Sequence, residues 1–160
     1  MNRPATLLVL LLAGLLAGCG GGSRPTGIRA AETPADDVAE YQPRWRSHTV
    51  DSTQYRKVFL AGTIDMGRSS DWQAALVARF RDSIGGRWLF FNPRRREFHA
   101  SPAEMEYQVA WELAHLEAAD LIVMNLLGDS RSPISLLEMG LYARSGKLFV
   151  ACSPDYYRYD

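Results

Sequence analysis

The sequence from Ala118 to Ala151 is AADLIVMNLLGDSRSPISLLEMGLYARSGKLFVA, and it predicts a strand, a loop, a helix and a second strand. Its first apolar run, 121–127, is short and almost uninterrupted, which is typical of a strand buried on both faces of a parallel sheet. After a polar loop, SLLEMGLYARSG carries apolar residues at helical spacing, with Gly146 as a stop before a strand over 148–152. This unit predicts an α/β fold.

One carboxylate, Glu138, lies among the apolar residues of that helix, within about one turn of its predicted start. In an open α/β sheet the ligand crevice forms at the carboxyl ends of the strands, where a helix N-terminus favours negative charge. We therefore expect Glu138 to be an ionised carboxylate that faces a ligand.

Length and charge limit the class of protein. At 160 residues and 47% hydrophobic composition, the chain has room for one domain with a sizeable core. Eighteen basic residues balance eighteen acidic ones, so no overall field would hold a nucleic-acid polymer or an anionic membrane surface. Small ligands are the expected partners. The three histidines lack the spacing of a metal site, and neither a metal nor a cofactor is expected.

The N-terminus predicts an export signal. Arg3 precedes the apolar run TLLVLLLAGLLAG, which is too short to span a bilayer comfortably. The sequence LAGC that ends at Cys19 resembles the lipobox of bacterial lipoproteins. We expect a signal peptide over 1–18 and a lipid anchor on Cys19, with an ordinary signal peptide or a misassigned start codon as alternatives. Gly20 is not the Asp that tends to retain lipoproteins at the inner membrane, which favours the outer membrane facing the periplasm.

Two regions follow the signal. Residues 19–56 are rich in Gly, Pro, Ser, Ala and charge without apolar periodicity, which predicts a flexible tether. A single domain is expected over 57–160. Its predicted strands cover 57–64, 87–92, 121–127 and 148–152, and its predicted helices cover 72–84, 102–118 and 135–146.

Charged residues next to these elements leave alternatives open. Glu112 falls on or beside the buried stripe of the 102–118 helix, where an unpartnered carboxylate would have a raised pKa. It is alternatively a surface glutamate or one half of an ion pair with an arginine. The three arginines at 94–96 follow a predicted strand and form either a solvated loop or part of an anion-collecting rim.

Four segments together resemble the nucleoside 2-deoxyribosyltransferase superfamily. They are VFLAGTIDMG from Val58, FFNPRR from Phe90, EMEYQVAWELAHLEAADLIVM from Glu104 and SPISLLEMGLYARSGKLFVACSP from Ser132. The resemblance spans about 58–157 and implies a flavodoxin-like fold, here a small Rossmann-like parallel sheet of four to five strands with helices on both faces. It also implies a glutamate that attacks C1′ of a deoxyribose and displaces the base, which is Glu138 on this sequence.

The same resemblance assigns further site residues. Glu112, eight residues before Asp120, matches a second acidic residue that is usually Asp in related enzymes. Ser132 stands where enzymes for free nucleosides carry Asp, and where deoxynucleoside 5′-monophosphate N-glycosidases carry a serine that meets the phosphate. The other expected ligand-binding residues are Gly62, Thr63, Ile64, Arg68 as an anion clamp and Asn92 at the rim.

Cleavage of an N-glycosidic bond passes through an oxocarbenium-like state, which favours one ionised carboxylate beneath C1′ and one protonated acid near the base. We expect Glu138 to be the charged partner and Glu112 the acid. The predicted function is cleavage or transfer of the N-glycosidic bond of a nucleoside or nucleoside 5′-monophosphate. Alternatives are a non-catalytic nucleotide-binding lipoprotein of the same fold and a hydrolase of another N-riboside such as NAD. The resemblance also implies a homo-oligomer.

Overall fold

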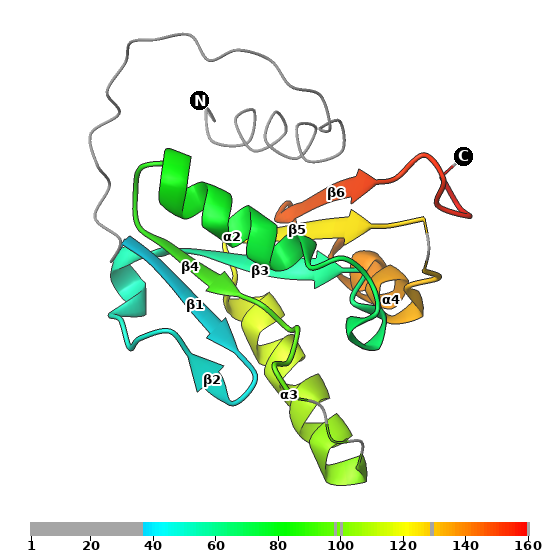
Figure 1. Cartoon of the computed structure of the whole chain (residues 1–160), viewed down its shortest axis with the longest axis horizontal. Coiled ribbons are helices and arrows are strands. Elements are labelled where there is room, and N and C mark those ends of the chain that lie inside the picture. The colour runs from blue at the N-terminus through cyan, green and yellow to red at the C-terminus, as the bar shows by residue number, and fades with distance from the viewer. Residues whose placement is uncertain (1–36, 98, 100, 129, 160) are drawn as a thin grey trace, which may run out of the picture. The chain divides into compact units, whose positions relative to one another are not determined.

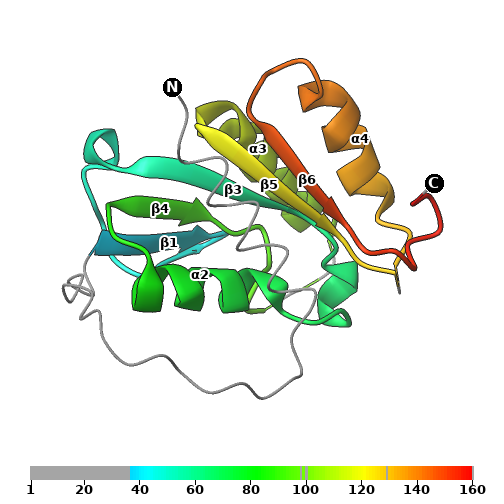
Figure 2. The same cartoon turned by 90° about the horizontal axis from the view of Figure 1, so that it is seen from above.

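In the computed structural model, which describes residues 37–97, 99, 101–128 and 130–159, the described residues form a six-stranded sheet covered by helices on both faces (Figures 1 and 2). The strands are β1 (Val38–Gln42), β2 (Trp45–Arg46), β3 (Arg56–Gly62), β4 (Trp88–Phe91), β5 (Leu121–Leu126) and β6 (Leu148–Cys152). The helices are α2 (Trp72–Ser83), α3 (Pro102–Ala118) and α4 (Pro133–Tyr142), with short 3-10 turns at Ser52–Gln54 and Asp65–Gly67. The predicted α/β fold is confirmed, with six strands in place of four to five.

The strand order is β2-β1-β4-β3-β5-β6, and every neighbouring pair is parallel except β1 with β2. The chain passes from β3 to β4 on one side and then returns to β5 on the other side of β3. Right-handed crossovers consequently place α2 on one face and both α3 and α4 on the opposite face, as Figure 2 shows. The direction reverses between β3 and β5, and this is where an open α/β sheet binds its ligands.

Local signals explain where the helices begin. The carboxylate of Asp71 accepts a hydrogen bond from the Ala74 N–H at 3.0 Å and caps α2. Ser101 caps α3 in the same way, since its hydroxyl accepts from the Glu104 N–H at 3.2 Å ahead of Pro102. Both starts agree with the sequence-based expectation.

Strand β1 lies inside the region that was expected to be a tether. It pairs with β2 on one side and β4 on the other. Even Glu40 in its centre is buried, and its carboxylate accepts a 2.8 Å hydrogen bond from Asn92 Nδ2. A strand covered on both faces shows no apolar alternation, and a charged residue in its middle hides it further. The tether prediction is therefore wrong for residues 37–56, most of which belong to the sheet or its turns.

The predicted signal peptide (1–18), the lipidated Cys19 and the first part of the expected tether lie outside the described residues. Among the residues that are described, no helix is long and apolar enough to cross a membrane.

Candidate active site

The backbones of β3 and β5 meet closely at the point where the sheet changes direction. Gly62 ends β3 with a φ of 119°, and a Cβ atom at this position would overlap the backbone of Asn125. The next residue continues the contact, because the Thr63 N–H donates to the Asn125 carbonyl at 2.8 Å. A glycine is thus required here by both backbone conformation and space.

A pair of buried hydroxyl groups lies directly beyond this contact. Thr63 Oγ1 accepts a hydrogen bond from the Leu127 N–H at 3.0 Å and is 2.7 Å from Ser132 Oγ. Ser132 is the N-cap residue of α4, yet its side chain turns to Thr63 and does not cap the helix. Among the described residues, no side chain caps the first turn of α4, so N–H groups of that turn remain available to an anion.

Glu138 lies in the second turn of α4 and is only 8% exposed. No described residue donates a hydrogen bond to its carboxylate. Burial, together with the negative charge of Glu112, raises the pKa of Glu138 from its ordinary value of 4.5 to about 8. The raised pKa favours the protonated form of Glu138 in the ligand-free protein at neutral pH.

Glu112 is on α3, the other helix on this face of the sheet. Its Oε1 accepts a 2.6 Å hydrogen bond from Gln108 Nε2, and Arg95 Nε in turn donates to Gln108 Oε1. Burial raises the pKa of Glu112, while the Gln108 hydrogen bond and the charge of Arg95 oppose this rise. Glu112 thus has support for a negative charge that Glu138 lacks.

Glu112 was expected to be the acid with the raised pKa, and its pKa is indeed raised. Glu138 was expected to be the ionised partner, yet its pKa is raised as well, to about 8. The reason is local geometry. Helix α4 starts at Pro133, so Glu138 lies beyond the first turn, where the favourable field of a helix N-terminus fades. Desolvation then dominates the pKa of Glu138.

The residues predicted to bind the ligand fall into two groups in the structure, four that lie together and two that lie elsewhere. Gly62, Thr63, Ile64 and Ser132 gather at the carboxyl end of β3 and the start of α4. Arg68 lies on the surface, where its guanidinium pairs with Asp65 at 2.8 Å. Asn92 is 1% exposed, and its amide is engaged with Glu40 and with the Arg94 N–H, which places it within the sheet and not at a ligand rim.

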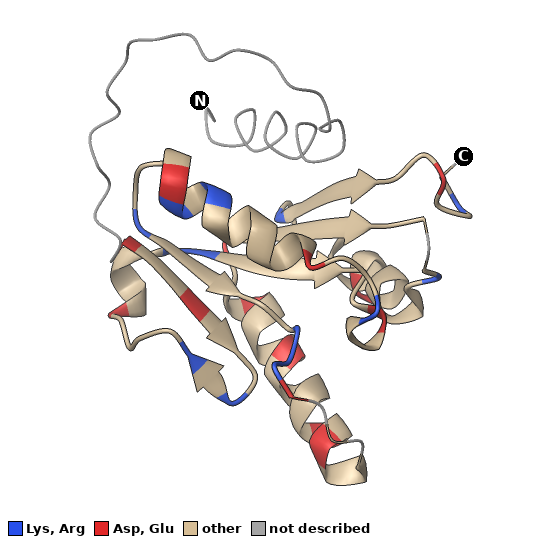
Figure 3. Ribbon diagram, viewed as in Figure 1, with Lys and Arg blue, Asp and Glu red and all other residues tan. Residues whose placement is uncertain are grey.

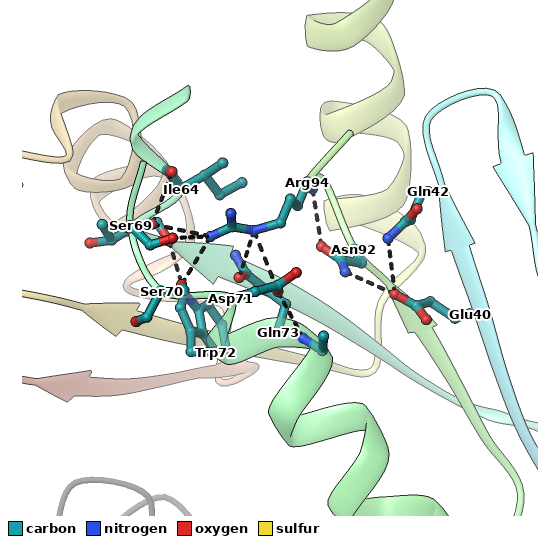
Figure 4. A network of polar contacts seen from close by, with 12 residues as sticks. Glu40, Gln42, Ile64, Ser69, Ser70, Asp71, Trp72, Gln73, Asn92 and Arg94 are labelled. Carbon is teal, nitrogen blue, oxygen red and sulfur yellow. Dashed lines mark hydrogen bonds and ion pairs between the residues drawn. The ribbon is translucent and has the colours of Figure 1, made fainter. Parts of the chain in front are cut away.

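The arginines at 94–96 form neither a solvated loop nor an open rim. Arg94 is buried, and Figure 4 shows its guanidinium between the loop after β3 and the start of α2. Its Nη2 donates to Ser69 Oγ at 3.1 Å and to the Ser70 carbonyl at 3.0 Å, and its Nε lies 3.2 Å from Gln73 Oε1. Arg95 pairs with Glu104, and Arg96 stacks over the ring of Trp45. Arg94 consequently fixes the loop that continues from Thr63.

Three residues of this region were missed from sequence. Gln108 could have been found, because it precedes Glu112 by the four residues that bring helical side chains together. Asn125 interrupts an apolar strand, and its buried Oδ1 has no hydrogen-bond partner among the described residues. Tyr156 gave no signal, although its hydroxyl donates to the Arg131 carbonyl at 2.8 Å and holds the loop that carries Ser132.

Within the described residues, no group of His, Cys, Asp and Glu side chains could hold a metal ion. His115, one turn after Glu112, stacks on Trp111 and has its Nδ1 2.6 Å from the Trp111 carbonyl.

The fold and the site together define an α/β protein whose two electrostatically coupled glutamates lie on neighbouring helices over one face of the sheet, an arrangement suited to glycosidic bonds. The sequence model of the family described as nucleoside 2-deoxyribosyltransferase like matches residues 55–156, and the chain belongs to this family. Comparison with curated proteins gave no match. The resemblance noted from the sequence motifs is confirmed at the level of the family, whose members are expected to bind nucleosides.

Proposed function

We propose that the protein cleaves the N-glycosidic bond of a deoxynucleoside or deoxynucleoside 5′-monophosphate, with Glu138 as nucleophile and Glu112 as general acid. The observation that supports this most is the coupling of the two carboxylates. Glu112 raises the pKa of Glu138 from a neighbouring helix, within a fold family named for deoxyribosyl transfer.

In the first step, a carboxylate oxygen of Glu138 attacks C1′ and the bond between C1′ and the base nitrogen breaks. The electron pair of that bond goes to the nitrogen, which takes a proton from Glu112. This requires the proton held by Glu138 in the ligand-free state to pass to Glu112. Positive charge developing at C1′ favours this exchange, since it lowers the pKa of the carboxyl beneath the sugar. Water or a second base then attacks C1′ and gives a proton to the Glu112 carboxylate, while the bond between C1′ and the Glu138 oxygen breaks and Glu138 leaves as a carboxylate.

A 5′-phosphate is supported by the start of α4. Ser132 offers a hydroxyl where a carboxylate would repel the phosphate, and the uncapped first turn of α4 offers backbone N–H groups. We propose that the phosphate binds at these groups, beside Thr63.

The test is release of free base by the purified full-length protein. Deoxynucleosides, their 5′-monophosphates and NAD are supplied in parallel, and the base is measured by chromatography. Glu138→Gln should abolish release, whereas Glu97→Gln, at an exposed glutamate 15 residues before Glu112, should retain it. Base release by Glu138→Gln at the wild-type rate, or none by the wild type from any of these compounds, would overturn the proposal.

Covalent catalysis has its own readout. A deoxynucleoside with a fluorine at C2′ slows breakdown of the sugar ester, so the intact mass should rise by one fluorosugar in the wild type and not in Glu138→Gln. Addition of a second free base then distinguishes transfer, which yields a new nucleoside, from hydrolysis, which yields only the sugar.

A further inference from the structure

The side-chain amide of Gln108 has its oxygen and both of its hydrogens engaged. Its Nε2 donates to the Pro93 carbonyl at 3.1 Å and to Glu112 Oε1 at 2.6 Å, and its Oε1 accepts a hydrogen bond from Arg95 Nε. A guanidinium can only donate, so Arg95 requires the amide oxygen of Gln108 on its own side. The NH2 group of the amide must then point towards Glu112.

Arg95 is itself held in place by the first turn of α3. Only 7% of its side chain is exposed. Its Nη1 donates to Glu104 Oε2 at 2.8 Å, and its Nη2 donates to the Glu104 carbonyl at 2.7 Å. Contacts with the side chain and the backbone of one residue leave the planar guanidinium little freedom to turn. Figure 3 shows the basic loop after β4 lying along the acidic helix α3.

The turn between β1 and β2 reaches the same carboxylate. Arg44 in this turn donates from Nη2 to Glu104 Oε1 at 2.7 Å, and its backbone N–H donates to the Tyr107 hydroxyl at 3.2 Å. Its guanidinium also lies 4.1 Å from the centre of the Tyr107 ring. The hydrogen bond from Arg44, together with that from Arg95, lowers the pKa of Glu104, which therefore carries a negative charge between the two arginines. Both β1 and β2 precede residue 55, where the family segment begins.

The charge of Arg44 determines how strongly Arg95 acts on Glu112. Glu104 offers one negative charge to two arginines, so one positive charge remains uncompensated. Without Arg44, Glu104 would neutralise Arg95 alone, and the positive field at Glu112 would weaken.

The groups that act on Glu112 come from its own helix, from the loop after β4 and from α4. Burial raises the pKa of Glu112, whereas the hydrogen bond from Gln108 and the charge of Arg95 lower it. Glu138 on α4 is the carboxyl whose pKa is raised in turn by Glu112. Any change in how Gln108 and Arg95 are held should therefore change the titration of Glu112.

Four residues connect the turn between β1 and β2 to Glu112, and we name them the positioning chain: Arg44, Glu104, Arg95 and Gln108. We propose that the positioning chain orients the general acid, so that Glu112 Oε2 carries the proton for the leaving base. This inference rests on the proposed function, because it takes Glu112 as the acid. Oε1 is occupied as the acceptor for Gln108, which leaves Oε2 to bind the proton.

In the reaction, the proton passes from Oε2 to the base nitrogen, which keeps the electron pair of the broken bond to C1′. The hydrogen bond from Gln108 and the charge of Arg95 then stabilise the Glu112 carboxylate that is left.

Titration of the carboxyl carbon resonance of Glu112 tests the positioning chain without any substrate. In the full-length protein its midpoint should rise in Gln108→Leu. It should rise less in Arg44→Met, because Arg44 is exposed and acts through other residues. Each variant should keep the far-ultraviolet circular dichroism spectrum of the wild type, and the exposed Arg44 remains testable should Gln108→Leu fail to fold.

Arg46→Met is the matched control. It removes a second arginine from the same pair of strands, one that stacks over the ring of Tyr41 and is not part of the positioning chain. The midpoint of Glu112 should stay at its wild-type value in this variant. An unchanged midpoint in Arg44→Met, or an equal rise in Arg44→Met and Arg46→Met, would overturn the proposal.

The leaving group tests the role in catalysis. 5-Fluorouracil departs as an anion more readily than uracil, so its release depends less on a general acid. Gln108→Leu should lower kcat at least about tenfold for deoxyuridine 5′-monophosphate and clearly less for its 5-fluoro analogue. Loss of folded protein would lower both rates by the same factor, so equal losses would overturn the positioning role.

The two measurements separate this inference from the function on which it rests. A wild type that releases no base from any nucleotide, with midpoints that shift as expected, would overturn the proposed reaction and support the contacts of the positioning chain. Base release by the wild type with an unchanged midpoint in Gln108→Leu would leave the reaction standing and overturn the positioning chain.

Discussion

The hydroxyl oxygens of Thr63 and Ser132 are 2.7 Å apart, and this contact joins the end of β3 to the start of α4. It has two consequences for a ligand. The Ser132 side chain is withdrawn from the helix it precedes, which frees the first-turn N–H groups of α4. The contact is also buried, where water screens charge weakly. A charge introduced at Ser132 would therefore act strongly on a ligand bound beside it.

Ser132→Asp should discriminate between phosphorylated and free nucleosides. A carboxylate at this position repels a 5′-phosphate, so kcat/KM for the 5′-monophosphate should fall at least about tenfold relative to the value for the matching nucleoside. Because the readout is a ratio within one variant, general loss of stability cancels. Ser132→Ala removes the hydroxyl without adding charge and should change the ratio less. Equal effects of both variants would argue against a phosphate at Ser132.

Glu138 should make stability depend on pH. Its pKa is raised from 4.5 to about 8 on folding, so the folded protein binds the proton more tightly than the unfolded chain. The stabilisation is fully present below pH 4.5 and is lost as pH rises through about 8. Each pKa unit corresponds to about 1.4 kcal/mol, so the loss should reach a few kcal/mol.

Urea unfolding of wild type and Glu138→Gln from pH 4.5 to 9 measures this effect. The glutamine variant lacks the titrating group and should become the more stable protein at alkaline pH. Parallel stability curves over the whole range would contradict the raised pKa. The carboxyl carbon resonance of Glu138 provides a direct check, and its midpoint should shift downward in Glu112→Gln because the repelling charge is gone.

Gly62→Ala should be strongly destabilising, by about 3 kcal/mol, because the new methyl group overlaps the Asn125 backbone and the left-handed conformation is strained. Gly67→Ala is the matched control. Gly67 also has positive φ, 81°, but a Cβ atom there meets open space, so only the strain of about 1 kcal/mol remains. Chemical denaturation of both variants gives the comparison, and equal losses would show that the close approach of β3 and β5 is unimportant.

Arg94→Met should lower stability by about 2–3 kcal/mol, since it removes buried charge-assisted hydrogen bonds to Ser69, Ser70 and Gln73. Proteolysis should then cut the 65–71 loop faster. Arg96→Met loses a surface stacking contact with Trp45 and one exposed hydrogen bond to Gln42 Oε1, and it should cost less than about 1 kcal/mol. A similar loss in both variants would contradict the role of Arg94 in fixing this loop.

Most elements of the fold were predictable because their signals are local. Ser101 and Pro102 mark a helix start, and uninterrupted apolar runs mark the buried parallel strands. Strand β1 escaped detection since the carboxylate of Glu40 is held by partners that are distant in sequence, a hydrogen bond from Asn92 and an ion pair with Arg81. No pattern within the strand itself reveals such partners.

The candidate site was predictable in composition but not in electrostatics. Motif resemblance named Thr63, Ser132, Glu112 and Glu138. In the structure Thr63 contacts Ser132, and the charge of Glu112 acts on Glu138. The proton on Glu138 depends on its depth and on a charge from another helix. The amide of Asn92 donates to Glu40 of β1, a strand that was not predicted. The raised pKa of Glu138 and the hydrogen bond of Asn92 both arise from residues that are close in space but distant in the chain. Residue spacing within a single sequence does not reveal such contacts.

Strand β1 lies outside the segment that defines the family, which begins at residue 55. A fragment cut at that boundary would expose the backbone of β4 along its length and leave the amide of Asn92 without its carboxylate. Such a fragment would expose an unpaired sheet edge that can pair with other chains. Recombinant protein that begins at residue 55 should therefore precipitate, whereas protein that begins before Val38 should stay in solution.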